Sequence, residues 1–89
     1  MYCLHLYVSG RVQGVWFRQS TKDAAEANGV CGWAKNLPDG RVEVMACGEE
    51  KGVRQLEAWL SIGPELATVA EVLSEPVQCE ECFTGFEIR

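Results

Sequence analysis

The sequence lacks any long apolar run, and its 89 residues leave no room for a second domain. No apolar stretch approaches the roughly 18 residues that a membrane-spanning helix needs, so no membrane partner is expected. No basic segment precedes an apolar run near Met1, which argues against a secretory signal and predicts a cytoplasmic protein. Repeats, linkers and low-complexity segments are also absent, and no apolar patch is evident. We therefore expect one monomeric globular domain over residues 1–89.

The chain also has few basic residues, because its 8 Lys and Arg residues are outnumbered by 13 Asp and Glu residues, for a net charge of −5. Nucleic-acid-binding proteins usually carry a basic footprint, so this balance argues against a nucleic-acid partner. The charge is unevenly distributed, with +2 over residues 1–42 and −7 over residues 43–89. An anionic ligand should therefore be sought in the first half of the chain.

Hydrophobic periodicity predicts the elements in the order β-α-β-β-α-β, followed by a short last strand. The expected strands cover residues 2–9, 30–36, 41–47, 67–73 and 83–88, with Ser9-Gly10 ending the first and Pro76 interrupting after the fourth. The expected helices cover residues 17–28 and the segment from Glu49-Glu50 to Gly63-Pro64. Two split βαβ units in this order predict an α+β, ferredoxin-like βαββαβ sandwich. Its sheet should be antiparallel with a short fifth strand, and both helices should cover one face.

The turn between the first strand and the first helix is the first candidate site. Residues 10–18 read GRVQGVWFR. Gly10 and Gly14 permit positive φ, so main-chain N–H groups can converge beside the positive end of a helix and form an anion cradle. Arg18 falls in the first helical turn, where the macrodipole disfavours a cation. A phosphoryl group would compensate, because its oxygens can accept two parallel hydrogen bonds from the planar guanidinium. The alternative is a tight turn with a solvated arginine, and spacing alone leaves both open.

Asn36 is the second candidate, at the end of the second predicted strand. It precedes the hairpin signal Leu37-Pro38-Asp39-Gly40, so locally it also fits the role of a turn residue. In a split βαβ unit, however, the first and second strands run parallel with the third between them. Both then finish at the same end of the sheet, and Arg18 and Asn36 can face one pocket.

These residues carry a family resemblance. GRVQGVWFR strongly resembles the phosphate-binding loop of acylphosphatases, and residues 32–36, with Gly40-x-Val42 and Gly48, resemble that family's second signature. Gly63-Pro64, Ala67, Val69 and the Phe86-x-Ile88 ending also fit, so the resemblance covers essentially the whole chain. Trp16 stands where the family commonly has glycine or another residue.

The resemblance implies hydrolysis of an acyl phosphate to a carboxylate and inorganic phosphate, without metal or cofactor. Arg18 would bind the phosphoryl group and Asn36 would orient the attacking water. The phosphate-binding residues would be Gln13, Gly14, Val15, Trp16, Phe17 and Arg18, acting largely through their N–H groups. Positioning and charge stabilisation carry phosphoryl transfer, so the absence of an acid–base pair is consistent with this chemistry.

The five cysteines raise two further points, and their odd count argues against a secreted disulfide framework. By alternation Cys3 and Cys47 lie on the outer faces of neighbouring strands, and a cross-strand disulfide is geometrically possible, although a reducing cytosol opposes it. Cys79-x-x-Cys82 supplies only two of the four ligands of a tetrahedral metal site. Two alternatives to an enzyme are kept: a module that binds a metal through this cysteine pair, and a module that binds an anion without catalysis.

Overall fold

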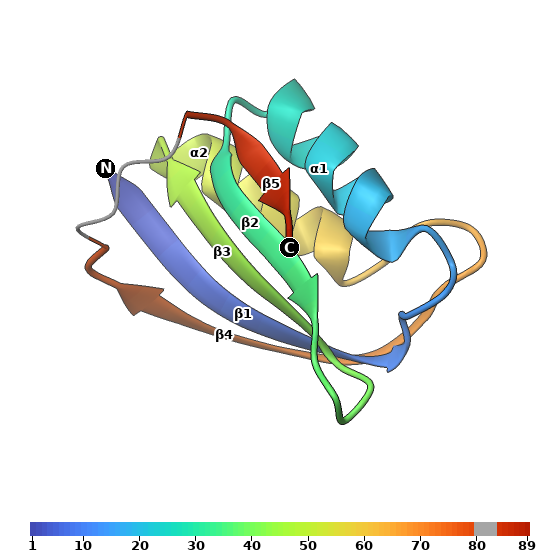
Figure 1. Ribbon diagram of the computed structural model, residues 1–89. Coiled ribbons are helices and arrows are strands. Elements are labelled where there is room, and N and C mark those ends of the chain that lie inside the picture. Colours follow the sequence, from blue (N-terminus) through green and yellow to red (C-terminus); the bar gives the residue numbers. More distant parts are fainter. Residues whose placement is uncertain (80–83) are drawn as a thin grey trace.

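The chain folds into two layers, a five-stranded sheet and two helices that cover one of its faces (Figure 1). The computed structural model describes residues 1–79 and 84–89. None of the described helices combines the length and the apolar character needed to cross a membrane. In chain order the elements are β1 (Tyr2–Arg11), α1 (Phe17–Ala27), β2 (Cys31–Asn36), β3 (Val42–Gly48), α2 (Glu50–Leu60), β4 (Thr68–Val77) and β5 (Phe86–Ile88).

The strand order in the sheet is β4-β1-β3-β2-β5, which confirms the ferredoxin-like fold. β1 pairs antiparallel with β3 and β4, and β2 pairs antiparallel with β3. The sheet is mostly antiparallel, as expected, and the short fifth strand is the exception, because β5 runs parallel to β2. The long excursion of the chain between these two strands provides the crossover that parallel pairing requires. Because β1 and β2 both run antiparallel to β3, they point in the same direction, and their C-terminal ends lie at the same end of the sheet.

The core lies between the sheet and the helices. Alternate residues of β1, namely Leu4, Leu6 and Val8, turn inward and are fully buried, as the period-2 pattern predicted. They meet the apolar stripes of the helices, which include Phe17 and Leu56. The face of the sheet opposite the helices carries no covering layer of described residues (Figure 1).

Two predicted strand boundaries were wrong for identifiable reasons. β1 continues past Ser9 because Gly10, at φ +118°, accommodates a bulge against β4 and its missing Cβ leaves room for the Thr68 carbonyl. β4 continues through Pro76 to Val77. It is an edge strand, where a residue without an N–H is tolerated.

The second helix and the last strand also differ from expectation. α2 ends at Leu60, three residues before Gly63, and Gly63 instead donates its N–H to the Trp59 carbonyl at 2.8 Å. Gly63 then packs so tightly against Phe17 that an added Cβ would lie 3.1 Å from that ring. β5 begins at Phe86, and Phe83, which was expected to start it, lies outside the described residues.

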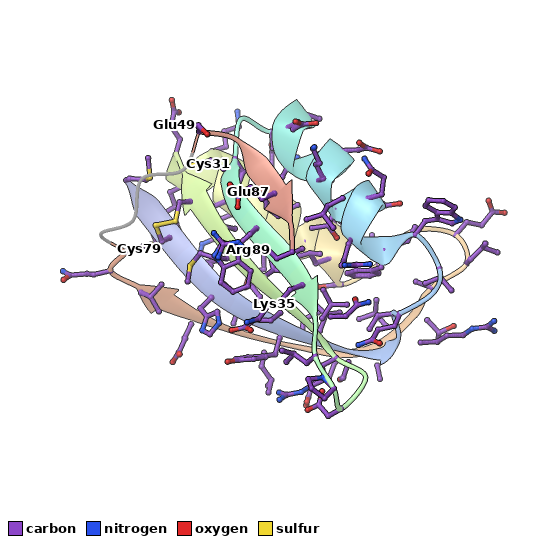
Figure 2. All side chains as sticks on the ribbon, viewed as in Figure 1. Cys31, Lys35, Glu49, Cys79, Glu87 and Arg89 are labelled. Carbon is purple, nitrogen blue, oxygen red and sulfur yellow. A yellow bond between two sulfur atoms is a disulfide. The ribbon has the colours of Figure 1, made fainter. Side chains whose placement is uncertain are left out.

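Cys3 and Cys47 face each other across the β1–β3 pair, with their Cα atoms 4.2 Å apart. Both are buried, with 3% and 0% exposure, although neither belongs to the core between sheet and helices. The structure joins their sulfur atoms, and the bond is drawn in yellow in Figure 2. We propose that this cross-strand disulfide forms in the oxidised protein.

If it forms, reduction should destabilise the protein. The bond links residues 44 positions apart and so restricts the unfolded chain. We expect a reductant to lower the free energy of unfolding by about 3 kcal/mol, measured by urea denaturation. Cys31→Ala, which leaves both partners in place, should keep this sensitivity, and the double variant Cys3→Ala/Cys47→Ala should lose it. A wild type with the same unfolding curve in both redox conditions would contradict the proposal.

Candidate functional site

Three buried side chains fix the loop between β1 and α1. Val12, Val15 and Phe17 all belong to the core, and the Phe17 ring also lies 6.1 Å from that of Trp59. The loop residues between and after these anchors are thereby turned outward, and Gly14 and Trp16 are exposed. Thr21 is fully buried one turn later and donates its hydroxyl to the Phe17 carbonyl at 2.7 Å, which is a structural role.

The loop backbone turns twice through the left-handed region. Gly14 has φ +74°, and Trp16, the residue that precedes α1, has φ +61°. Such values suit glycine and are unusual for a bulky side chain. Within the described part of the chain, none of the N–H groups of residues 14–18 donates a hydrogen bond. Together with the helix N-terminus they form a set of unsatisfied donors suited to an anion.

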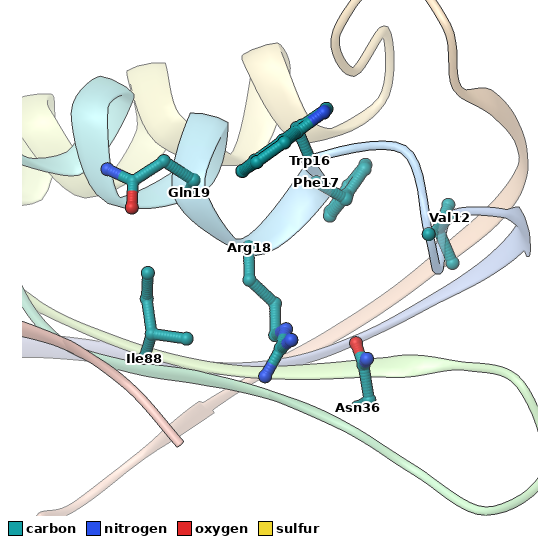
Figure 3. A pocket seen from close by; sticks show the side chains of 8 residues that line it. Val12, Trp16, Phe17, Arg18, Gln19, Asn36 and Ile88 are labelled. Atoms are coloured by element: carbon teal, nitrogen blue, oxygen red, sulfur yellow. The ribbon is translucent and has the colours of Figure 1, made fainter.

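This loop forms one wall of a cavity of about 410 Å³. Its lining brings together Arg18 and Asn36, as the strand directions predicted. Figure 3 shows the two side chains projecting into the same space, Arg18 from the first turn of α1 and Asn36 from the end of β2. The full lining is Val12, Gly14, Trp16, Phe17, Arg18, Gln19, Asn36 and Ile88.

Arg18 is held by the segment after β5. Its Nη1 donates to the main-chain oxygen of Arg89 at 2.9 Å. Arg89 is positioned in turn by its own N–H, which donates to the Ala34 carbonyl of β2 at 2.9 Å. This contact uses one of the guanidinium's five N–H donors, so the others remain for a ligand. Nothing in the sequence of residues 10–18 pointed to Arg89.

Several hydrogen bonds close the hairpin after Asn36. The Leu37 N–H donates to the Arg41 carbonyl at 2.8 Å and closes the turn. Within it, Asp39 accepts the Arg41 N–H at 3.0 Å and the Arg41 Nε at 2.7 Å. These bonds, the main-chain one above all, hold the pKa of Asp39 below its ordinary value.

Gln13 ties this hairpin to the loop. Its Nε2 donates to the carbonyls of Leu37 and Arg41, at 2.8 and 2.9 Å. The side chain therefore bridges the two segments that carry Arg18 and Asn36. The sequence placed Gln13 among the phosphate-binding residues, but neither it nor Val15 lines the cavity. A glutamine in a glycine-containing loop gives no local signal of such a distant partner.

Other chemically capable residues lie elsewhere. The sole histidine, His5, faces Glu43 on the outer side of the sheet, with Nε2 and Oε2 2.6 Å apart. Burial raises the pKa of Glu43, but the His5 hydrogen bond and the Lys35 charge outweigh it and keep that pKa below its ordinary value. Cys79 is a free, half-buried thiol, and Cys82 lies outside the described residues. Over residues 1–79 and 84–89, no group of three or more His, Cys, Asp or Glu side chains could hold a metal.

Comparisons with known proteins identify the family to which the chain belongs. The acylphosphatase family model matches residues 4–88. The chain is 53% identical over 85 residues to the acylphosphatase of Hahella chejuensis, covering 96% of this chain and 90% of that one. Among solved structures, an acylphosphatase from Coxiella burnetii superposes with a TM-score of 0.93 at 43% identity, covering 99% of this chain and 92% of the other. The acylphosphatase of Bacillus subtilis gives a TM-score of 0.95 at 31% identity, covering 100% and 99%.

The bridge made by Gln13 predicts a stability effect. Gln13→Ala removes two hydrogen bonds and leaves two carbonyls without this donor. We expect the free energy of unfolding to fall by about 1–2 kcal/mol, measured by urea denaturation. Gln55→Ala, on the exposed side of α2, is the matched control and should be nearly neutral. Equal effects of the two substitutions would show that the bridge contributes nothing.

Proposed function

Because the chain belongs to the acylphosphatase family and is an acylphosphatase, we propose that Arg18 and Asn36 carry its reaction. The enzyme hydrolyses acyl phosphates to a carboxylate and inorganic phosphate. In this proposal Arg18 and the loop N–H groups bind the phosphoryl group, and Asn36 orients the attacking water. The observation that carries it is the shared cavity of Arg18, Asn36 and the outward-facing loop.

The loop and Arg18 supply the positive charge that phosphoryl transfer needs. The unsatisfied N–H groups of residues 14–18 suit the phosphoryl oxygens. The Arg18 guanidinium can add a bidentate contact, because its bond to the Arg89 main-chain oxygen uses only one of its five N–H donors. These groups are held before the ligand arrives, so little reorganisation accompanies the reaction.

Asn36 has the chemistry to place a water but not to deprotonate it, because an amide is no base at neutral pH. The water oxygen attacks phosphorus, the bond from phosphorus to the bridging oxygen breaks, and the carboxylate leaves with the bond's electron pair. The water proton passes to a phosphoryl oxygen, which yields inorganic phosphate. A carboxylate is a stable leaving group, so the step calls for no general acid and no metal.

We also propose that the enzyme acts as a cytoplasmic monomer on small molecules, with acyl phosphate and phosphate as its ligands. The net charge of −5 supports the absence of a nucleic-acid partner. The rival hypothesis is a domain that binds the anion without turning it over, and the variants below separate the two.

Loss of Arg18 should abolish most of the activity. Arg18→Ala is expected to lower kcat/KM for benzoyl phosphate by about a thousandfold, since a positioned guanidinium has an effect of that order in phosphoryl transfer. The measurement is phosphate release in excess EDTA, with folding checked by circular dichroism. Arg18→Lys should restore little of the activity, because an ammonium cannot donate the two parallel hydrogen bonds of a planar guanidinium.

The matched control is Arg54→Ala on α2, whose guanidinium contacts Glu57 at 3.2 Å outside the cavity. It should retain wild-type kinetics. A folded Arg18→Ala protein with near-normal kcat/KM would refute the assignment, and an inert wild type would favour the non-catalytic module.

Asn36 should affect turnover more than binding. Asn36→Ala is expected to lower kcat about 100-fold, because the water loses its orientation. The inhibition constant of inorganic phosphate should change little, since Arg18 and the loop remain. Asn28→Ala, which removes an amide bonded to the Ala24 carbonyl after α1, serves as the control for activity. If phosphate binding and kcat fall together, Asn36 binds the anion rather than the water.

A further inference from the structure

The cavity that contains Arg18 and Asn36 also has an apolar part, which the steps above do not use. Trp16 and Ile88 both line it. Figure 3 shows Trp16 on the helix side and Ile88 on the sheet side, beside the Arg18 side chain. Cavities of a few hundred Å³ bind whole small molecules, so about 410 Å³ leaves room beyond a phosphoryl group.

The Trp16 side chain is exposed to solvent rather than packed against the protein. Its side chain is 77% exposed, the most of any described tryptophan, although indoles normally find cover. Within residues 1–79 and 84–89 its ring makes no aromatic or cation–π contact. It also stands at φ +61°, where glycine would be free of strain. A large exposed ring at a strained position beside the reacting group indicates a contact that is made only with a ligand.

Ile88 completes this apolar part from the other side. It is 40% exposed, and it lies on β5 opposite Ala34 of β2. In Figure 3, Ile88 and Asn36 lie on opposite sides of the Arg18 side chain. In phosphoryl transfer the attacking and leaving oxygens are roughly in line, so a water held at Asn36 directs the leaving carboxylate away from Asn36. The acyl group then extends toward Ile88 and Trp16.

We propose that Trp16 and Ile88 bind the acyl group of the substrate and make this enzyme selective for acyl phosphates with an aromatic or extended apolar acyl group. The inference rests on the proposed function, because it takes the phosphoryl position from Arg18 and the water position from Asn36. An indole face and an isoleucine side chain suit a phenyl ring or an alkyl chain, and they gain little from a single methyl group.

The test compares kcat/KM for benzoyl phosphate with kcat/KM for acetyl phosphate, each divided by the rate of uncatalysed hydrolysis. The wild type should favour benzoyl phosphate. Trp16→Gly, which suits the backbone and removes the ring, should reduce this preference about tenfold, and Ile88→Ala severalfold. Trp16→Phe keeps an aromatic face and should retain most of the preference. The matched control Ile62→Ala removes an exposed apolar side chain that does not line the cavity, and it should leave the preference intact.

The inhibition constant of inorganic phosphate separately measures binding of the anion to Arg18 and the loop N–H groups. If Trp16→Gly keeps its phosphate inhibition constant and loses the preference, the inference stands. If phosphate binding is also lost, the loop has been disturbed and the Ile88→Ala result decides. An active wild type whose preference survives both Trp16→Gly and Ile88→Ala overturns the inference alone. A wild type inert toward both substrates overturns the proposed function, and this inference falls with it.

Discussion

Burial of Val12 and Phe17 on either side of a short loop is the constraint on which the site depends. Each is held in the core between sheet and helices, and burying a side chain of this kind contributes about 1.5–3 kcal/mol. With both ends fixed, the residues between them have little choice of direction. Gly14 and Trp16 turn outward, and the N–H groups of residues 14–18 donate to no acceptor within the described residues. The core thus determines the shape of the cradle before any anion is present.

That arrangement runs against local preferences at two positions. Trp16 in the left-handed region costs about 1–3 kcal/mol relative to a relaxed backbone. Arg18 places a cation at a helix N-terminus, which costs about 0.3–1 kcal/mol. A bound phosphoryl group would relieve the second cost by neutralising Arg18, but not the first. The backbone strain is therefore present in the free enzyme, and the packing of Val15, Phe17 and Gly63 must maintain it.

The sequence predicted the parts of the site that depend on periodicity and chain direction. The alternation in β1 and the order of the first three strands were enough to bring Arg18 and Asn36 to one edge of the sheet. Features that depend on tertiary partners were missed. Gln13 was assigned to phosphate largely through its N–H group, and the partners of its side chain, in a hairpin 24 and 28 residues away, were not predicted. Pro76 looked like a break because its tolerance depends on β4 being an edge strand, which a local pattern does not reveal.

The shortest strand links the two ends of the proposed reaction. β5 pairs with β2 through only three residues, with Ile88 opposite Ala34, and Arg89 continues the contact by donating to the Ala34 carbonyl. Asn36 lies two residues beyond Ala34 on the same strand. The register of this single pair therefore positions Ile88, the Arg89 oxygen that holds Arg18, and Asn36 relative to one another. A slip of one residue would turn Ile88 to the outer face of the sheet and carry the Arg89 main-chain oxygen away from Arg18. Burial of Phe86 against the core opposes such a slip, because its inward position is compatible with only one register.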